Sequence, residues 1–201
     1  MPIDTLTAPS GKTLLRRATW TTTSKESADA KIVRISQEKT TRLEENRNLL
    51  ADRNVSAFLK AIAEAEGGGY DFKYGAIKGK RNYPWRFSDF STHPGPGFGG
   101  STTAAGMYQI TIATWRQHGG KMGLTDFAPT TQDLIAVEIL RSLRVIDKIR
   151  SGDIPGAIGP AAKTWAALPM GPGLGNAHPP QPFVKYDDFF HTYQAAGGTG
   201  K

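Results

Sequence analysis

Apolar positions recur at helical spacing in several stretches of the chain, and the clearest of these stretches ends in a run of glycines. In the segment AFLKAIAEAE, the large apolar residues Phe58, Leu59 and Ile62 fall on one helical face. Ser56 precedes this segment and predicts a helix that begins there, with the serine as its N-cap. The three glycines at 67–69 predict where the helix ends.

The two glutamates at the end of this helix are expected to face opposite ways. At about 100° per residue, Glu66 lies about 20° around the helix axis from Leu59, so it continues the apolar face. Glu64 lies about 160° from Glu66, on the side expected to face solvent. A carboxyl group that is desolvated at the negative end of a helix has a raised pKa, as a general acid requires. A buried glutamate paired with Arg or Lys is the structural alternative for Glu66.

The remaining pattern predicts further helices and one segment of short hairpins. Residues 70–100 alternate aromatic and polar residues between glycines and prolines, which is typical of hairpins and loops. Later stretches return to helical spacing, and the longest of them covers 130–150. The other helices are expected from near Ser101 to Ala105 onward, over 111–119, over 157–169 and over 183–197. The layout is therefore a set of helices around a small β-lobe inserted after the first of them.

The N-terminal quarter of the chain differs in composition from the rest. Residues 1–25 are rich in threonine, serine, lysine and arginine, with TWTTTSK as a candidate short strand. The stretch that follows is polar, with helical spacing around 37–52, and has few large apolar side chains to form a core. We therefore expect residues 1–54 to be an N-terminal extension and residues 55–201 to be the folded domain.

Composition and charge restrict the classes of function. The 201 residues contain no cysteine, which excludes disulfides, thiol nucleophiles and cysteine-ligated metals. No apolar run approaches the ~20 residues of a membrane span, and the N-terminus lacks the apolar core of a secretory signal. The net charge of +7 favours anionic partners, but the densest basic cluster, KGKR at 78–81, is too short to predict nucleic-acid binding. The four histidines are dispersed without metal-ligand spacing, so we expect no metal or cofactor.

Several ordered motifs between Ala57 and Gly198 resemble those of a known family. They are AFLKAIAEAEG, FSDFSTHP, STTAAGMYQI, MGLTDFAPTTQDLIAV and WAALP. In this order and spacing they resemble the phage endolysins of the lambda type, which are lytic transglycosylases of the lysozyme superfamily. The resemblance implies an α+β, lysozyme-like fold, with a mainly α-helical lobe, a small β-lobe and an active-site cleft between them.

The same resemblance implies roles for individual residues. In the family the catalytic glutamate closes the first helix immediately before a glycine, and here that position is Glu66. The family's substrate contacts carry over to Asp89, Tyr108, Gln109 and Asn176. Glu66 is then expected to protonate the oxygen between N-acetylmuramic acid and N-acetylglucosamine. It is next expected to deprotonate the muramic C6 hydroxyl, which closes a 1,6-anhydro ring without cofactor or metal.

Other functions remain open at this point. A hydrolysing muramidase would need a second carboxylate, ~5–5.5 Å away in a retaining enzyme or ~6.5–9.5 Å away in an inverting one. Asp71 and Asp89 are the candidates for it. A non-catalytic wall-binding or virion structural protein could keep the fold, but it would not need Glu66. A nucleic-acid binder would account for the charge and not for the glutamate.

The resemblance to endolysins also predicts the partners and the location of the protein. Peptidoglycan glycan strands are the expected substrate, and residues 1–54 are expected to dock on a phage tail or spike protein. The protein is expected in the host cytoplasm until its release to the periplasm and cell wall, or in the virion. A shortened chain beginning near Asn54 is expected to fold and to clear cell walls.

Overall fold

The computed structural model describes residues 5–7, 13–15, 27–80 and 84–200. Contacts within the chain divide it into two compact units, Met1–Ile35 and Ser36–Lys201. In the first unit, strand β1 (Thr5–Thr7) pairs with strand β2 (Thr13–Leu15) in antiparallel register. The strand predicted for TWTTTSK lies outside the described residues.

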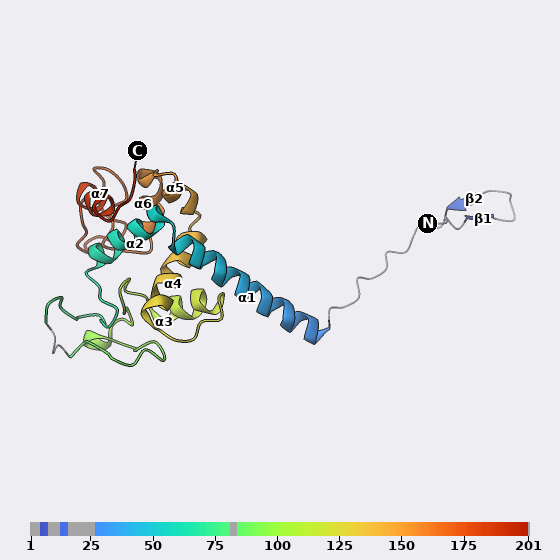
Figure 1. Cartoon of the computed structure of the whole chain (residues 1–201), viewed down its shortest axis with the longest axis horizontal. Helices are drawn as coiled ribbons and strands as arrows, with labels where there is room; N and C mark the ends of the chain where they lie inside the picture. The colour runs from blue at the N-terminus through green and yellow to red at the C-terminus, as the bar shows by residue number, and fades with distance from the viewer. Residues whose placement is uncertain (1–4, 8–12, 16–26, 81–83, 201) are drawn as a thin grey trace. The chain divides into compact units, whose positions relative to one another are not determined.

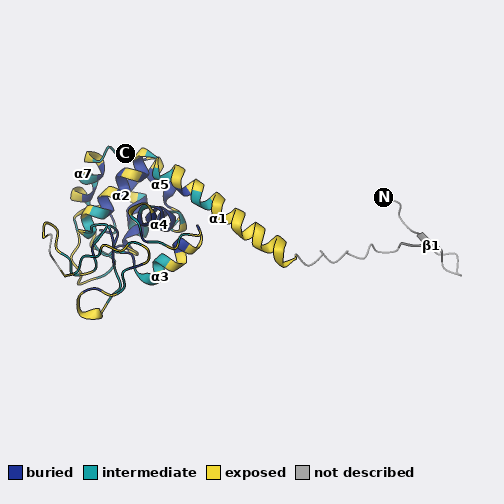
Figure 2. Ribbon diagram, turned by 60° about the horizontal axis from the view of Figure 1, so that its bottom comes forward, coloured by how far each residue is buried: buried dark blue, intermediate teal, exposed yellow. Residues whose placement is uncertain are grey.

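The rest of the described chain is mainly helical (Figure 1). Its helices are α1 (Ala28–Leu50), α2 (Arg53–Glu66), α3 (Ile112–Thr114), α4 (Pro129–Ser142), α5 (Ile146–Arg150), α6 (Ile154–Ala162) and α7 (Tyr186–Ala195), with a 3₁₀ turn η1 (Phe98–Gly100) and a π-helical turn η2 (Trp115–Gly119). Helix α4 is buried along most of its length (Figure 2). None of the described helices is both long enough and apolar enough to cross a membrane.

Helix α2, which ends at Glu66, is fixed by packing along its apolar face. Phe58 is fully buried and makes edge-to-face contacts with Phe189 and Tyr193 of α7, with ring centroids 5.2 and 6.4 Å apart. The predicted start at Ser56 was wrong, because the helix begins at Arg53. Its N-cap is Asp52, whose carboxylate accepts hydrogen bonds from the first free backbone N–H groups of the helix.

Other predicted helices also differ from the structure, and the one expected over 157–169 is α6, which begins at Ile154 and ends at Ala162. The long helix expected over 130–150 is divided into α4 and α5, because Arg144 takes a left-handed conformation with φ 58°. This turn brings Val145 and Ile146 into the core. The helix expected from near Ser101 to Ala105 is absent, because Gly106 has a φ of 79° and the chain folds back in a tight loop.

The predicted β-lobe is built from loops. Over 67–80 and 84–111 the structure has isolated bridges, which join Phe72 to Arg86, Lys73 to Ala105 and Ala105 to Ile110, and no longer strand. Glycines with positive φ interrupt the alternating pattern that had indicated hairpins. They are Gly75, Gly79, Gly95, Gly99, Gly100 and Gly106.

The C-terminal half of α1 belongs to the second compact unit, which begins at Ser36 and not near residue 55. Asn46 is fully buried and donates a hydrogen bond of 2.9 Å to Glu138 of α4. Glu138 is also fully buried and forms ion pairs with Arg42 at 3.3 Å and Lys121 at 3.2 Å. Burial alone would raise the pKa of Glu138, but these three partners outweigh it and hold the pKa below its usual value. The leucines of α1 that pack against the core are Leu43, Leu49 and Leu50.

Candidate active site

Glu66 is the last residue of α2 and its carboxylate is partly buried. Burial raises the pKa of Glu66 above its usual value. A hydrogen bond of 3.2 Å from the Ala167 backbone N–H to Oε1 and the nearby charge of His178 oppose this rise without cancelling it. Glu64, by contrast, is exposed and pairs with Lys78 at 2.8 Å. The predicted contrast between the two glutamates is confirmed.

The three glycines after Glu66 each have a separate structural reason. Gly67 adopts the left-handed conformation, with φ 62°, that closes the helix. A Cβ on Gly68 would lie 2.2 Å from the carbonyl oxygen of Met107. A Cβ on Gly69 would lie 2.9 Å from the ring of Phe72. The glycines therefore end the helix and let the chain that follows Glu66 pass close to a second backbone segment.

This second segment is the loop around Met107, and a buried glutamine holds it in place. Gln132 of α4 is fully buried and accepts a hydrogen bond of 2.8 Å from the Met107 N–H. Its Nε2 donates to the carbonyl oxygens of Tyr70 and Phe127, each at 2.9 Å. A Cβ on Gly106 would lie 2.2 Å from Gln132 Oε1, which explains the glycine there. Gln132 therefore fixes the loop against the segment that follows α2.

Next to this loop lies a partly buried cluster of two tyrosines and an aspartate. The hydroxyls of Tyr108 and Tyr70 donate to Asp133, at 2.8 and 2.9 Å. Burial raises the pKa of Asp133, and it raises the pKa of Tyr70 to about 12 with the help of the adjacent carboxyl group. Trp165 donates its indole N–H to the carbonyl oxygen of Tyr108 at 3.1 Å. The cluster joins the Met107 loop to α4 and to the segment that follows α2.

A cleft of about 660 Å³ opens in front of Glu66, and we call it the main cleft. Its lining residues come from the end of α2, the loop lobe, the Met107 loop and the segment after α6. They are Glu66, Gly67, Phe72, Lys73, Tyr74, Gly75, Ala76, Ser101, Thr102, Ala104, Gln109, Thr111, Thr164, Trp165, Ala166 and Gln181. Glu66 is the only carboxylate among the described residues that line it.

A second cavity of about 520 Å³ adjoins the main cleft, and we call it the side cavity. It is lined by Ala65, Glu66, Tyr74, Ala166, Ala167, Gln181, Pro182, Phe183 and Val184. Four of these residues, Glu66 among them, also line the main cleft. The catalytic candidate therefore lies where the two hollows meet.

Of the four predicted substrate contacts, one lines the main cleft and three do not. Gln109 lines the main cleft together with Glu66, and its backbone has a φ of 48°. Tyr108 is buried in the cluster with Asp133 described above and does not line the cleft. Asp89 is exposed, accepts a hydrogen bond of 2.8 Å from the Ser91 N–H and lines neither hollow. Asn176 also lies outside the lining, where it braces a neighbouring loop.

Some lining residues were not predicted as site residues. Lys73 and Tyr74 belong to the aromatic–polar segment that the sequence singled out, and Trp165 belongs to the WAALP motif. These signals identified the right segments but not the individual contacts. Gln181 follows a proline-rich loop that carries no comparable signal.

Neither candidate for a second catalytic carboxylate lines the main cleft or the side cavity. Asp71 is held by Arg86, whose Nε donates to it at 2.7 Å, and the Arg86 guanidinium lies over the ring of Phe72. Asp89 caps its own turn, and hydrogen bonds from Ser91 lower its pKa. Both aspartates are therefore engaged in local structure.

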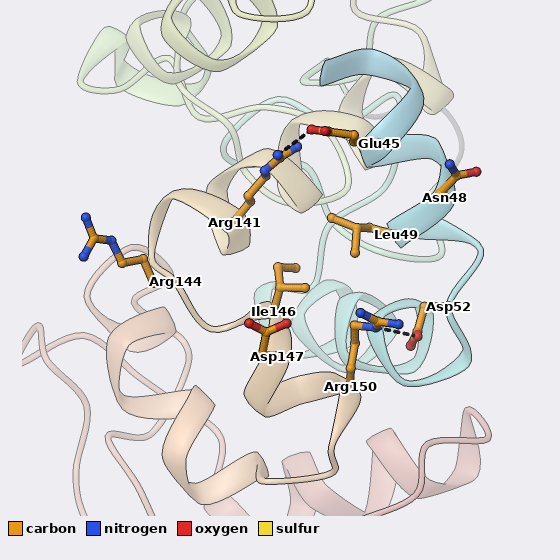
Figure 3. Close-up of a pocket in the computed structure, with 9 residues that line it drawn as sticks. All are labelled: Glu45, Asn48, Leu49, Asp52, Arg141, Arg144, Ile146, Asp147 and Arg150. Atoms are coloured by element: carbon orange, nitrogen blue, oxygen red, sulfur yellow. Dashed lines mark hydrogen bonds and ion pairs between the residues drawn. The ribbon is translucent and has the colours of Figure 1, made fainter. Parts of the chain in front are cut away.

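A separate cavity of about 690 Å³ lies between α1, α4 and α5 (Figure 3). Most of its charged side chains pair with one another, since Arg141 meets Glu45 and Arg150 meets Asp52. It contains neither Glu66 nor a set of side chains suited to a metal, and no metal-binding cluster occurs among the described residues. The main cleft is therefore the candidate active site.

Comparisons with known proteins agree with this geometry. The sequence model of the Endolysin family matches residues 56–200. The Endolysin of Escherichia phage P2 is 34% identical over 141 residues, which cover 61% of this chain and 83% of that protein. The Endolysin of Escherichia phage lambda is 33% identical over 119 residues, which cover 56% of this chain and 70% of that protein.

Solved structures show the same relationship at the level of fold. Bacteriophage lambda lysozyme complexed with a chitohexasaccharide superposes with a TM-score of 0.62 at 29% identity, covering 75% of this chain and 96% of that one. A second structure of lysozyme from bacteriophage lambda gives a TM-score of 0.60 at 27% identity, covering 74% of this chain and 97% of that one. The fold of the described helical unit is thus that of lambda lysozyme.

Proposed function

The chain belongs to the endolysin family, and on that premise we propose that it degrades peptidoglycan as a lytic transglycosylase. The bond cleaved is the β-1,4 bond from N-acetylmuramic acid to N-acetylglucosamine. The product is a 1,6-anhydro muramic end, and no water is consumed.

One observation carries this proposal. The main cleft contains a single carboxylate, Glu66, among its described lining residues, and burial raises the pKa of that carboxylate. A hydrolase of the usual two-carboxylate kind needs a second acidic group close to the scissile bond. A transglycosylase does not, because the nucleophile is a hydroxyl group of the substrate itself. The site therefore supports ring closure better than hydrolysis.

The proposed steps need only groups that are present in the site or the substrate. Glu66, whose pKa is raised by burial, donates its proton to the glycosidic oxygen as the bond to the anomeric carbon breaks. The carboxylate that results accepts the proton of the muramic C6 hydroxyl, whose oxygen attacks the anomeric carbon. Glu66 is then protonated again and ready for the next turnover. The Ala167 N–H, bonded to Oε1, holds the carboxyl group in position throughout.

The rest of the main cleft suits a glycan. Hydroxyl and amide side chains such as Thr102, Thr111 and Gln109 can bond sugar hydroxyls and N-acetyl groups, and the exposed ring of Tyr74 offers a surface to the sugars. Lys73, the only basic side chain among the described lining residues, suits the acidic groups of the wall.

The test compares three carboxylate-to-amide variants in the clearing of purified cell walls. Glu66→Gln should lose at least a hundredfold in rate, in the range of ~10²–10⁴ for a general acid and base. Asp71→Asn and Asp89→Asn should keep most of their activity once the folded fraction is matched by thermal melting. Strong clearing by Glu66→Gln, or a loss in either aspartate variant as large as that of Glu66→Gln, would refute the single-carboxylate assignment.

We also propose that the N-terminal extension docks on a phage tail or spike protein and that the enzyme reaches the wall from the virion or after release from the host cytoplasm. Exposed apolar side chains on α1 support a docking role, with Ile32 66% and Val33 55% exposed. Mass spectrometry of purified virions tests this, because a docked enzyme is found there in fixed ratio to tail proteins. Its absence from virions would leave release from the host as the route.

A further inference from the structure

The two hollows that meet at Glu66 differ in chemistry. The main cleft carries hydroxyl, amide and ammonium groups along its walls. The side cavity is lined chiefly by alkyl and aromatic groups, contributed by three alanines, Pro182, Phe183 and Val184. Phe183 is 42% exposed although it faces a concave surface. An exposed aromatic ring in a hollow beside a catalytic group indicates a ligand with apolar parts.

The wall of the side cavity is held firmly. The Val184 N–H donates to the Ala167 carbonyl oxygen at 2.9 Å, and the Gln181 N–H donates to that of His178 at 2.9 Å. Asn176 braces the same loop, since its Nδ2 donates to the Gln181 carbonyl oxygen at 2.8 Å. These bonds fix the backbone from 178 to 184 before any ligand arrives, as a binding wall requires.

One peptide unit connects this wall to the catalytic group. The Ala167 N–H donates to Glu66 at 3.2 Å, and the Ala167 carbonyl oxygen accepts from Val184. A ligand that fills the side cavity therefore lies against the same backbone that holds the carboxyl group. A glycan bound at Glu66 therefore brings the sugar at the scissile bond and its substituents to the opening of the side cavity.

We propose that the side cavity binds the lactyl–alanyl arm, the start of the stem peptide that branches from the muramic acid at the scissile bond. This inference rests on the proposed function and adds to it a preference for peptide-bearing glycan over bare glycan. Phe183 is the specificity-determining residue, through contact with the methyl groups of the arm.

The chemistry of the arm matches the lining. The lactyl group and the first alanine each carry a methyl group, and an amide joins them. The methyl groups suit Phe183, Pro182 and Val184. The side chain of Gln181 lines the cavity and has no hydrogen-bond partner among the described residues, so it is available to the amide of the arm. A bare sugar ring presents hydroxyl groups, which would meet no matching partners on the apolar wall.

The volume also fits. At about 520 Å³ the side cavity falls within the ~300–1,000 Å³ of small-molecule sites, so it is larger than an N-acetyl methyl group needs. An arm of two short residues therefore fills it better than a substituent of the sugar ring alone.

The experiment uses two substrates made from one preparation of wall. One is intact peptidoglycan, and the other is the same material after an N-acetylmuramyl-L-alanine amidase has removed the peptides. The full-length protein is compared with Phe183→Ala, Phe183→Leu and the control Leu174→Ala. Leu174 is 58% exposed and lines neither hollow. Thermal melting confirms that each variant is folded.

Wild-type kcat/KM should be higher on intact wall than on stripped glycan. Phe183→Ala should lose on the order of tenfold on intact wall, as for the loss of an apolar specificity contact, and clearly less on stripped glycan, which keeps the lactyl methyl group but has lost the alanyl one. Phe183→Leu should fall between Phe183→Ala and wild type, and Leu174→Ala should match wild type on both substrates.

Two results would overturn the proposal. An equal loss on both substrates would show that Phe183 contacts the glycan itself, and no loss on either would show that the side cavity is unused. Should Phe183→Ala fail to fold, the Phe183→Leu ratio between the two substrates decides in the same way. Failure of the proposed function looks different, because wild type would then release no anhydro ends from either substrate.

Discussion

The close approach of the glycine turn to the Met107 loop predicts a large effect for the smallest possible substitution. Gly68→Ala adds one methyl group, which would lie 2.2 Å from the Met107 carbonyl oxygen and 2.8 Å from that of Gly106. Heavy atoms in ordinary contact lie ~3.5 Å apart, so the two segments must separate by about 1 Å. Both oxygens belong to the backbone, so no side-chain rotation can relieve these contacts.

Two consequences follow in different assays. Overpacking of this kind typically costs about 1–3 kcal/mol, which for a chain of this size lowers Tm by roughly 2–12 °C. The shift also moves Gln109 relative to Glu66, and a misplacement of ~1 Å can lower a catalytic rate about 100-fold. Activity per folded molecule should therefore fall far more than the loss of stability explains.

The matched control is Gly120→Ala. Gly120 has φ −59° and ψ −30°, and a Cβ there would meet nothing within 4 Å. Alanine suits that conformation and should stabilise the fold by about 0.4–1 kcal/mol, with full activity. Clearing rates measured well below both melting temperatures separate the two effects. If Gly68→Ala clears walls as fast as Gly120→Ala, the coupling between the helix end and the Met107 loop is refuted.

Two further predictions concern α1 and Glu66. A chain that begins at Ser36 should melt like the full protein. A chain that begins at Asn54 should lose about 3–5 kcal/mol of unfolding free energy, because the buried Glu138 loses its partners Asn46 and Arg42. Equal melting temperatures of the two shortened chains in calorimetry would contradict the packing of α1. Since burial raises the pKa of Glu66, the folded protein keeps the carboxyl proton to higher pH than the unfolded chain, in which the pKa is ~4.3. The free energy of unfolding therefore declines as pH rises from the unfolded pKa through the folded one. Glu66→Gln removes this decline, so its stability relative to wild type should rise from pH 4 to pH 8, and denaturant unfolding that shows a constant difference would exclude the shift.

The sequence predicted the end of α2 at Glu66 because local rules decide it. Helical spacing placed Glu66 on the apolar face, and the glycine run marked the end of the helix. The same local reasoning failed at Ser56, because Asp52 competes for the N-cap and is also held by Arg150, which is distant in sequence. Tertiary contacts of that kind leave no periodic signal.

The α1 helix shows a second limit. Its polar composition indicated an extension, yet Asn46 is fully buried, because Glu138 of α4 needs a donor there. Sequence patterns predict both members of a buried polar pair to be exposed, because polar residues are mostly found at the surface. Gln132 is a comparable case, because its three hydrogen bonds to the backbone depend on where distant segments meet.

The side of the cleft contributed by the loop at 181–184 could not be predicted for a related reason. Gln181 and Phe183 are exposed residues of a proline-rich loop, and only the folded chain brings them beside Glu66. By contrast, Trp165 lies in a motif that the sequence did identify, although its bond to the Tyr108 carbonyl oxygen was not foreseeable.

Mass analysis of the products released from purified peptidoglycan tests the central claim most directly, that one carboxylate closes an anhydro ring without water. The account predicts muropeptides that are one water lighter than ordinary reducing ends, that resist reduction by borohydride, and that vanish with Glu66→Gln. Muropeptides that are dominated by reducing muramic ends and are converted by borohydride would contradict it and would identify the enzyme as a hydrolase.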